Sequence, residues 1–376
     1  MRTAEHCASP FRPEFRTQLH HTSTHTLKLS SASQTPAATT RLCEHGQNEG
    51  LLLPTLIVIV NYGTPTLTID CLRSLASEVE SLPDTQVVVA DNASPDESAL
   101  EIPAAIQALG FSRWCHFVEL PRNGGFAYGN NTAIAWADSQ GDKWEACPAD
   151  LVWLLNPDTL VLEGALVELE RFMNLHPWVG IAGGCSVNSD GSARMSAFRF
   201  PTVKGELEAV LHFGPLSRLL RSSTTQSGNP QNAAKVDWVS GASMMVRRTL
   251  FDRLGMLDDA YFMYYEETDF CRRAAHAGVE CWHVPQSRVI HLVGQSSGVT
   301  GAGRLTKRRP RYWFDSRRRY FRRHHGLAAY HLANVCWLLG YPVGLTWRAI
   351  RGKPRSEPPM LWWDFLRFNY LSQNDG

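Results

Sequence analysis

The segment TLIVIVNYGTP (residues 55–65) decides the fold class. Its first six residues are β-branched or apolar and do not alternate with polar residues, which is typical of a strand buried on both faces of a sheet. Asn61 and Gly63 end that strand, and after Pro65 leucines and valines recur at helical spacing as far as Val79. A buried strand followed directly by a helix is the repeating unit of a parallel α/β sheet.

The same cycle recurs along the chain. Further strands are predicted at residues 86–90, 116–120, 151–155, 179–183 and 280–284, and further helices at residues 131–137, 164–175 and 266–278. Parallel strands joined by right-handed helical crossovers give a mostly parallel sheet with helices on its faces. Residues 186–235 show neither period, and their clusters of Ser, Gly, Asn and Gln predict a surface loop or an insertion.

The composition argues against several classes of protein. Lys and Arg total 37 against 36 Asp and Glu, and the net charge of +1 indicates no nucleic-acid partner. Nine scattered cysteines with no Cys-x-x-Cys pair favour a reducing compartment over a disulfide scaffold or a zinc ribbon. The sequence has no run of about 20 apolar residues, so no ordinary transmembrane span is expected.

Three regions differ in composition. Residues 1–50 are rich in Ser, Thr, His and Pro and lack the apolar segment of a secretory signal, so we expect a disordered extension there. Residues 51–300 carry the α/β pattern and form the expected main domain. Residues 301–376 form a basic, aromatic tail that we expect to be helical.

Polar residues follow the first four predicted strands. They are Asn61, Asp91 with Asn92, Asn123, and Asn156-Pro157-Asp158. Ligands of open α/β sheets bind beyond the carboxyl ends of the strands, where these residues gather. Each alone is equally typical of a turn or a helix N-cap, but all of them together favour a binding site. The Asp91 carboxylate could accept the ring N–H of a pyrimidine, and the Asp158 carboxylate could coordinate Mg²⁺ or Mn²⁺.

The segment NGGFAYGNN (residues 123–131) brings glycines and asparagines to a strand-to-helix junction. There the backbone can approach a ligand closely and side-chain amides can bond it. The segment lacks the Gly-x-Gly-x-x-Gly pattern of dinucleotide sites, and the chain has no Gly-x-x-x-x-Gly-Lys phosphate loop. The segment is therefore predicted to be a ligand-contacting loop, but one that differs from both the dinucleotide-binding loop and the phosphate loop.

Three carboxylates open the predicted helix at residues 266–278. They belong to Glu266, Glu267 and Asp269, and an aromatic run, residues 261–265, precedes them. Acidic residues in a first turn suit the helix dipole and need no other role. A carboxylate at the edge of an apolar pocket, however, is the setting that a general base requires. His291 follows this helix in the segment PQSRVIHLVGQS (residues 285–296).

Seven blocks of the sequence, taken in order, resemble family 2 glycosyltransferases of the bacterial rhamnosyltransferase branch. The blocks are NYGTPTLTIDCLRSL, VVVADNASPDES, RNGGFAYGNN, WLLNPDT, DWVSGASMMVRR, FMYYEETDFCRRAAHAG and VPQSRVIHLVGQSSG, which together cover roughly residues 54–325. The resemblance implies a GT-A fold, Rossmann-like with a mostly parallel central sheet flanked by helices, here with a C-terminal helical extension. It also implies inverting chemistry, a nucleoside-diphosphate-sugar donor and a divalent cation, Mn²⁺ or Mg²⁺.

The resemblance also implies roles for the candidate residues. Asp91 would hold the pyrimidine base, Asp158 would bind the metal, and His291 would add a metal or diphosphate contact. Glu267 would be the catalytic base, although the family usually has the shorter Asp there, so Glu266 and Asp269 remain alternative bases. The other expected nucleotide-sugar contacts are Asn61, Asn92, Asn123, Gly124, Gly125, Asn131, Asn156, Trp238 and Gly241.

The expected reaction is a single displacement at the anomeric carbon of the donor. By resemblance, the donor is dTDP-L-rhamnose, and the acceptor is a hydroxyl of a cell-surface polysaccharide or of its lipid-linked precursor. One alternative is a different donor, such as UDP-galactofuranose or a UDP- or GDP-hexose. Another is a non-catalytic carbohydrate-binding or scaffold protein that keeps the fold.

The tail carries a strong local charge. Residues 303–355 hold fourteen Lys or Arg and one acid, Asp315, a net charge of +13. Residues 331–350 form an apolar stretch, broken by Pro342 and Arg348, that suits an interfacial helix better than a span. Basic and aromatic segments attract anionic lipid, so we expect a cytoplasmic enzyme, peripheral at the inner face of the cell membrane. Alternatively, these helices only dock on the main domain.

Overall fold

The computed structural model describes residues 53–141, 149–211, 223–225, 228–292, 307–353 and 357–371. The chain divides into residues 1–49 and a compact unit, Gly50–Gly376, to which all described residues belong. The predicted disordered extension, residues 1–50, lies outside the described residues and stays a prediction.

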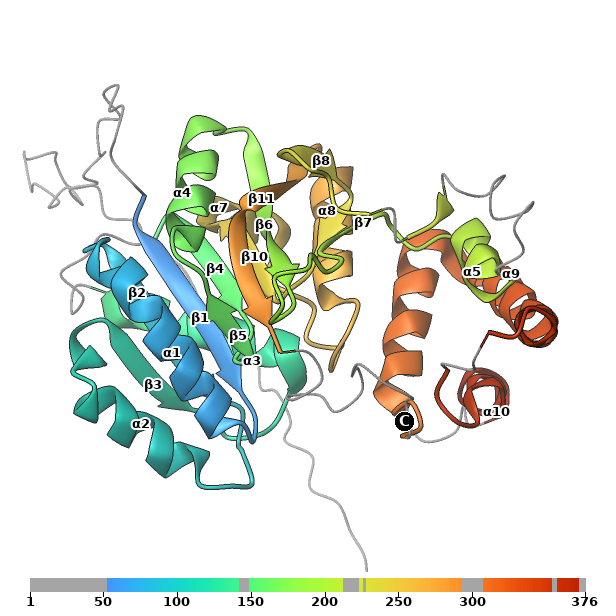
Figure 1. Cartoon of the computed structure of the whole chain (residues 1–376), viewed down its shortest axis with the longest axis horizontal. Helices are drawn as coiled ribbons and strands as arrows, with labels where there is room; N and C mark the ends of the chain where they lie inside the picture. Colours follow the sequence, from blue (N-terminus) through green and yellow to red (C-terminus); the bar gives the residue numbers. More distant parts are fainter. Residues whose placement is uncertain are drawn as a thin grey trace, which may run out of the picture. The chain divides into compact units, whose positions relative to one another are not determined.

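A mixed sheet forms the centre of the compact unit (Figure 1). Its strands are β1 (Thr55–Asn61), β2 (Thr85–Asp91), β3 (Cys115–Glu119), β4 (Leu151–Leu155), β5 (Thr159–Val161), β6 (Val179–Val187), β8 (Ala234–Val236), β10 (Ser243–Arg247) and β11 (Glu280–His291). Their order is β3-β2-β1-β4-β10-β6-β11-β5, and β8 pairs with β11. The neighbours from β3 to β4 are parallel, β10 is antiparallel to β4 and β6, and β11 is parallel to β6. The carboxyl ends of β1, β2, β3 and β4 therefore meet at one edge.

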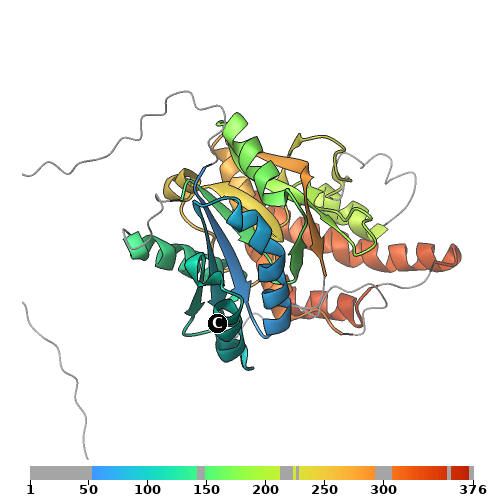
Figure 2. The same cartoon turned by 60° about the vertical axis from the view of Figure 1, so that its left-hand side comes forward.

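Helices cover both faces of this sheet. One face carries α1 (Pro65–Glu80), α2 (Ser98–Ala108) and α4 (Ala165–Leu175), and the other carries α3 (Gly125–Gln140), α7 (Arg248–Leu254) and α8 (Glu266–His276). Figures 1 and 2 show α1 (blue) and α4 (light green) in front of the same face. In β1, Ile57 and Ile59 pack toward the first group of helices, and Leu56, Val58 and Val60 pack toward the second.

This architecture confirms the predicted α/β fold of the GT-A class. All seven residues of β1 are buried, as expected for a strand covered on both faces. The strands predicted at residues 86–90, 116–120 and 151–155 each match an observed strand within one residue at either end.

Some predicted bounds are wrong. Helix α3 begins at Gly125 and not at residue 131, because its glycine-rich first turn hides the helical period. Strand β11 runs past residue 284 to His291, across a register irregularity between Val284 and Arg288. Residues 186–235, expected to be a surface loop or an insertion, contain the strand β7 (Ala197–Phe198), which pairs with β9 (Trp238–Val239), and the helix α5 (Val203–Leu211).

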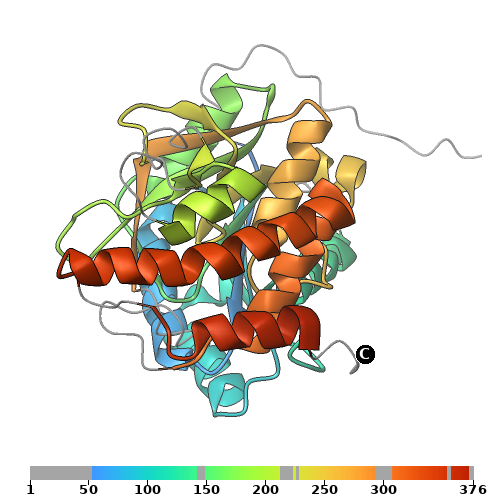
Figure 3. The ribbon, with the colours of Figure 1, turned by 90° about the vertical axis from the view of Figure 1, so that its right-hand side faces the viewer.

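The tail is helical, as predicted. Helix α9 (Arg311–Ile350) is interrupted at Gly326, where φ is +81°, so it consists of a first segment, residues 311–325, and a second segment, residues 327–350. A short helix, α10 (Leu361–Leu366), continues into the π-helical turn η4 (Arg367–Leu371), and Figure 3 shows α10 beside α9. No helix among the described residues is both long and apolar enough to span a membrane.

Candidate active site

Two of the predicted polar residues meet at the ends of β1 and β2. The Asn61 amide donates to Asp91 Oδ1 at 2.7 Å, and both side chains are buried. The Ser94 hydroxyl donates to the same oxygen at 2.6 Å, while the Ser94 backbone N–H donates to Asp91 Oδ2 at 2.9 Å. The Asp91 carboxylate is therefore fixed in one orientation at the ligand-binding edge, and its Oδ2 has capacity for another donor.

A second group joins the end of β2 to the start of α3. The Asn92 amide nitrogen donates to Asn123 Oδ1 at 3.0 Å and to the Gly125 carbonyl at 3.1 Å, while Asn92 Oδ1 accepts from the Gly124 N–H at 3.3 Å. The Gly125 N–H donates in turn to Asn123 Oδ1 at 3.0 Å. The structure thus brings together four residues that the sequence placed in one site.

Gly125 also makes the closest approach between the start of α3 and the loop before α8. Its φ is +87°, and a Cβ at this position would lie 1.9 Å from the carbonyl oxygen of Phe262. The next residue, Phe126, donates its N–H to that same oxygen at 2.9 Å. Only glycine fits here, because any side chain would clash with the backbone that leads to Glu267.

Asn131 lies apart from this group. Its amide nitrogen donates to the Leu257 carbonyl at 2.8 Å, and its amide oxygen accepts from the Leu257 N–H at 3.1 Å. Both ends of the side chain are therefore engaged by the loop after α7, so Asn131 holds that loop and is not oriented toward the Asn92 group.

The predicted metal residues converge from β4 and β11. The Asp158 carboxylate is buried, with Oδ1 3.3 Å from His291 Nε2, and the Asn156 amide lies 3.4 Å from the same nitrogen. No cluster of three or more His, Cys, Asp or Glu suited to a metal occurs in the described part of the chain. One carboxylate with one imidazole fits Mg²⁺ or Mn²⁺, which bind few protein groups and complete their shell with phosphate and water.

Glu267 and Glu266 open α8 after a strained turn. Tyr264 and Tyr265 have φ of +69° and +70°, which non-glycine residues rarely adopt and which are often found at functional sites. Burial raises the pKa of both carboxyls above the usual value, that of Glu266 more strongly because Glu267 is adjacent. Backbone N–H groups of Glu267, Thr268 and Gly241 and a hydrogen bond with Glu266 limit the rise at Glu267. The ionised form of Glu267 is thus stabilised by three backbone N–H groups, against one at Glu266.

Asp269 has a different environment from the two glutamates. It is buried, which alone would raise its pKa, but His324 at 2.7 Å and Arg273 at 2.8 Å outweigh burial and lower the pKa. The Tyr261 hydroxyl also donates to it at 3.3 Å. A carboxylate held by this many donors is a weak base, so Asp269 serves to join α8 to α9.

Gly241 connects the two halves of the site. A Cβ on Gly241 would lie 3.3 Å from the Phe126 ring and 3.9 Å from Glu267 Cβ, so this residue lies between α3 and α8. The backbone N–H of Asn156 donates to the Ala242 carbonyl at 3.2 Å, which joins the metal segment to the same turn. The predicted base and the predicted metal and nucleotide residues thus border one region.

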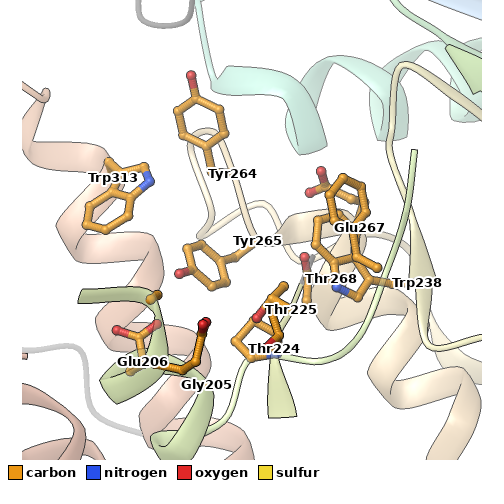
Figure 4. A pocket seen from close by; sticks show the side chains of 14 residues that line it. Gly205, Glu206, Thr224, Thr225, Trp238, Tyr264, Tyr265, Glu267, Thr268 and Trp313 are labelled. Carbon is orange, nitrogen blue, oxygen red and sulfur yellow. The ribbon is translucent and has the colours of Figure 1, made fainter. Parts of the chain in front are cut away.

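A cavity of about 650 Å³ adjoins Glu267. Figure 4 shows Trp238 and Glu267 on one side, Glu206 and Trp313 on the other, and Tyr264 and Tyr265 between them. The Trp238 ring stacks on Phe198 at 4.2 Å and donates its N–H to the Arg199 carbonyl at 2.9 Å. Trp238 therefore forms a wall of this cavity beside Glu267, across from Glu206 of α5 and Trp313 of α9.

Several residues of this cavity are not among those predicted from the sequence. They are Phe198, Glu206, Glu208, Thr224, Thr225 and Trp313. Most lie in the region expected to be a loop, and Trp313 lies in the tail. An aromatic residue in an otherwise basic segment was the available signal for Trp313, but nothing in its spacing connects it to Glu267.

This chain is similar to known glycosyltransferases. Residues 54–326 match the family model described as Glycosyltransferase like family 2. The N-acetylglucosaminyl-diphospho-decaprenol L-rhamnosyltransferase of Mycobacterium tuberculosis (strain ATCC 25618 / H37Rv) is 30% identical over 254 residues, 66% of this chain and 79% of the relative. The rhamnosyltransferase WbbL of Escherichia coli (strain K12) is 25% identical over 169 residues, 44% of this chain and 60% of the relative.

A solved structure extends the comparison. The mannosyltransferase PcManGT from Pyrobaculum calidifontis, in complex with GDP-Man and Mn²⁺, has a TM-score of 0.47 and 15% identity, covering 81% of this chain and 76% of that chain. The family model spans well over half of the sequence, and the two relatives named above are rhamnosyltransferases. The chain therefore belongs to the family 2 glycosyltransferases, in a rhamnosyltransferase-like branch.

Proposed function

We propose that this nucleotide-sugar glycosyltransferase inverts the anomeric centre of its donor and that Glu267 is the general base. The position of Glu267 carries the proposal. It lines the cavity, burial raises its pKa, and its Oε2 has no hydrogen-bond partner among the described residues. A general base needs a pKa nearer to the working pH and an oxygen available to the proton it removes.

In this mechanism, a hydroxyl of an acceptor seated in the cavity attacks the anomeric carbon from the face opposite the diphosphate. Glu267 takes the hydroxyl proton as the new bond forms. Glu266, which has the more strongly raised pKa, keeps its own proton and hydrogen-bonds to Glu267. This bond steadies the ionised form of Glu267, so the two adjacent carboxyls do not compete for the role of base.

The donor lies on the other side of Gly241 in this proposal. Asp91 accepts the ring N–H of the pyrimidine base, and the Asn92 group, with Asn123, Gly124 and Gly125, contacts the nucleotide. A divalent cation, Mn²⁺ or Mg²⁺, held by Asp158 and His291 would neutralise charge on the departing diphosphate. Asn61 supports this arrangement indirectly, because it holds Asp91 in place.

The donor sugar and the acceptor are proposed from the relatives. Both are rhamnosyltransferases by name, and the mycobacterial name specifies a diphospho-decaprenol acceptor. We therefore take dTDP-L-rhamnose as the donor and a hydroxyl of a cell-surface polysaccharide or its lipid-linked precursor as the acceptor. UDP-galactofuranose or a UDP- or GDP-hexose is the second candidate for the donor.

The proposal divides the chain into a catalytic domain, residues 51–300, and a tail, residues 301–376, at the inner face of the cell membrane. The tail also completes the site, because Trp313 lines the cavity. A non-catalytic carbohydrate-binding or scaffold protein would have no reason to keep a half-buried carboxylate such as Glu267, with its desolvation cost, beside an acceptor cavity.

A donor panel tests the proposal. The purified protein is mixed with Mn²⁺, a lipid-linked or soluble glycan acceptor and, in turn, dTDP-L-rhamnose, UDP-galactofuranose, UDP-glucose and GDP-mannose. Release of nucleoside diphosphate is measured, and NMR gives the anomeric configuration of the product. We expect transfer from dTDP-L-rhamnose with inversion. Retained configuration would contradict the mechanism, and nucleotide binding without turnover of any donor would favour the scaffold.

A further inference from the structure

Several basic residues in the first segment of α9 pair with acidic residues of the protein itself. Arg317 is buried and donates to Glu206 at 2.6 and 2.9 Å and to Asn334 at 2.6 Å. Arg319 and Arg323 pair with Asp258, which lies on the catalytic domain, at 2.7 and 2.6 Å. The positive charge of this segment therefore serves first to dock α9, and a lipid surface would need other groups.

The second segment of α9 carries an exposed apolar stripe that could contact lipid. The stripe consists of Leu332, Val335, Leu339, Val343 and Ile350. Its members follow one another at intervals of three, four, four and seven residues, so they lie along one face of the helix. Their exposed fractions are 55% for Leu332, 47% for Val335, 68% for Leu339, 58% for Val343 and 73% for Ile350. A row of exposed branched apolar side chains of this length is unusual on a protein surface that faces only water.

Aromatic and basic side chains border the stripe. The Trp362 N–H donates to the carbonyl of Leu338, the residue before Leu339, at 2.9 Å, and Trp362 and Trp363 are both partly exposed. Arg351 and Lys353 follow the end of the stripe and are exposed. The sequence contains no Asp or Glu between residues 316 and 353. Tryptophan beside an apolar face, with basic residues at the end of the helix, is typical of helices that lie in the interface of an anionic membrane.

A neighbouring face of the same segment packs on α5. A Cβ on Gly344 would lie 1.8 Å from the Val210 carbonyl oxygen, and one on Gly340 would lie 2.7 Å from a Val210 methyl group. Helix α5 also supplies Gly205, Glu206, Glu208 and Ala209 to the cavity beside Glu267. Figure 3 shows α5 (yellow-green) alongside the second segment of α9. Helix α5 thus contacts both the second segment of α9 and the proposed acceptor cavity.

We propose that the stripe, from Leu332 to Ile350, with Trp362 and Trp363, seats this enzyme in the surface of an anionic lipid bilayer. The helix lies in the plane of the interface with its apolar side chains below the headgroups, and Arg351 and Lys353 contact lipid phosphates. Contact of α5 with α9 then holds the cavity next to the lipid surface, which favours an acceptor anchored in that surface. This last step rests on the proposed transferase function, whereas binding to the bilayer does not.

Flotation with vesicles tests the inference on the full chain. Vesicles of phosphatidylcholine with phosphatidylglycerol are mixed with the wild type, with the double variant Leu332→Gln and Leu339→Gln, and with a matched control, Leu100→Gln and Leu175→Gln. The control removes two leucines that are exposed on α2 and at the end of α4. Glutamine suits exposed helix positions, so all three proteins should fold alike, which circular dichroism and transfer to a water-soluble acceptor verify.

The expected result is at least about a tenfold drop in the partition coefficient for the stripe variant, with no change for the control. High salt screens the attraction between charges but not the burial of apolar side chains. Binding of the wild type to vesicles should therefore persist in high salt to a greater extent than binding that depends on charge alone. Equal flotation of the two variants, no flotation of the wild type, or a dimer that the stripe variant abolishes would overturn the inference. Transfer to a soluble acceptor without vesicle binding would refute it and leave the proposed function intact. Vesicle binding without transfer from any donor would support the inference about the bilayer and refute the proposed function.

Discussion

Replacement of Gly125 by alanine tests whether the start of α3 sets the position of the proposed base. At φ of +87°, alanine costs about 1–2 kcal/mol in backbone strain. Its Cβ would lie 1.9 Å from the Phe262 carbonyl oxygen, where ordinary contacts begin at 3.4 Å, so the loop must move by more than 1 Å. That movement breaks the 2.9 Å bond from the Phe126 N–H, at a cost of about 1–3 kcal/mol. Together, the backbone strain and the broken hydrogen bond should lower the free energy of unfolding by about 3 kcal/mol.

Gly110 supplies a matched control. Its φ is +75°, but a Cβ there meets nothing within 4 Å, so Gly110→Ala should cost only the backbone strain, about 1–2 kcal/mol. Urea unfolding followed by circular dichroism gives both values. Gly125→Ala should also lower the transfer rate by about 100-fold, because the displaced loop leads directly to Glu267. Equal destabilisation by the two substitutions, or full activity of the folded Gly125→Ala protein, would refute this account of the loop.

Two further predictions concern buried carboxyls. Asp158→Asn should remove the stimulation of transfer by Mn²⁺ and lower the rate at least about 100-fold, with the fold unchanged by circular dichroism; wild-type transfer that continues in EDTA would remove the proposed metal role. Burial, with a contribution from the neighbouring Glu78, raises the pKa of Glu170 to about 7. As pH rises from 4.5 to 7, this carboxyl ionises in the unfolded state before it does in the folded state. The free energy of unfolding of the wild type should therefore fall by up to about 3 kcal/mol relative to that of Glu170→Gln, and it should fall no further above pH 7. Urea unfolding at pH 5 and pH 8 measures this difference, and a pH-independent difference would contradict the assignment.

The sequence was sufficient for six strands of the sheet because these strands are recognisable locally, whereas β5, β8 and β10 were not predicted. A run such as residues 55–60 has no hydrophilic face, so it has to be covered on both sides whatever the rest of the chain does. The start of α3 was not recognisable in the same way. Gly124 and Gly125 are poor helix formers, and the contact with Phe262 that requires glycine at position 125 joins residues far apart in the sequence.

In the candidate site too, the residues at strand ends could be predicted from the sequence, whereas a role that depends on tertiary contacts could not. Asn61, Asp91 and Asn92 lie at strand ends, and the structure brings them to one edge as predicted. Asn131 has the same residue type in the same motif, yet both ends of its amide bond the backbone of Leu257, which no sequence pattern indicates.

The tail shows the limit most clearly. The net charge of +13 is a property of the sequence, but the pairing of Arg317 with Glu206 and of Arg319 with Asp258 depends on tertiary contacts. The second segment of α9 has apolar residues on several faces, among them Trp337 and Leu339. Which face is covered follows only from the positions of α5 and α10.

The central claim is that Glu267, and not its neighbour Glu266, removes the acceptor proton. The most direct measurement compares Glu267→Gln with Glu266→Gln in single-turnover transfer from the best donor of the panel, with nucleotide affinity determined in parallel. Loss of the general base should lower the single-turnover transfer rate of Glu267→Gln about 10³-fold at unchanged nucleotide affinity. Glu266→Gln keeps a neutral group in place of a protonated carboxyl, so its transfer rate should stay within about tenfold of the wild-type rate. Near-wild-type transfer by Glu267→Gln, or the larger loss in Glu266→Gln, would contradict the claim.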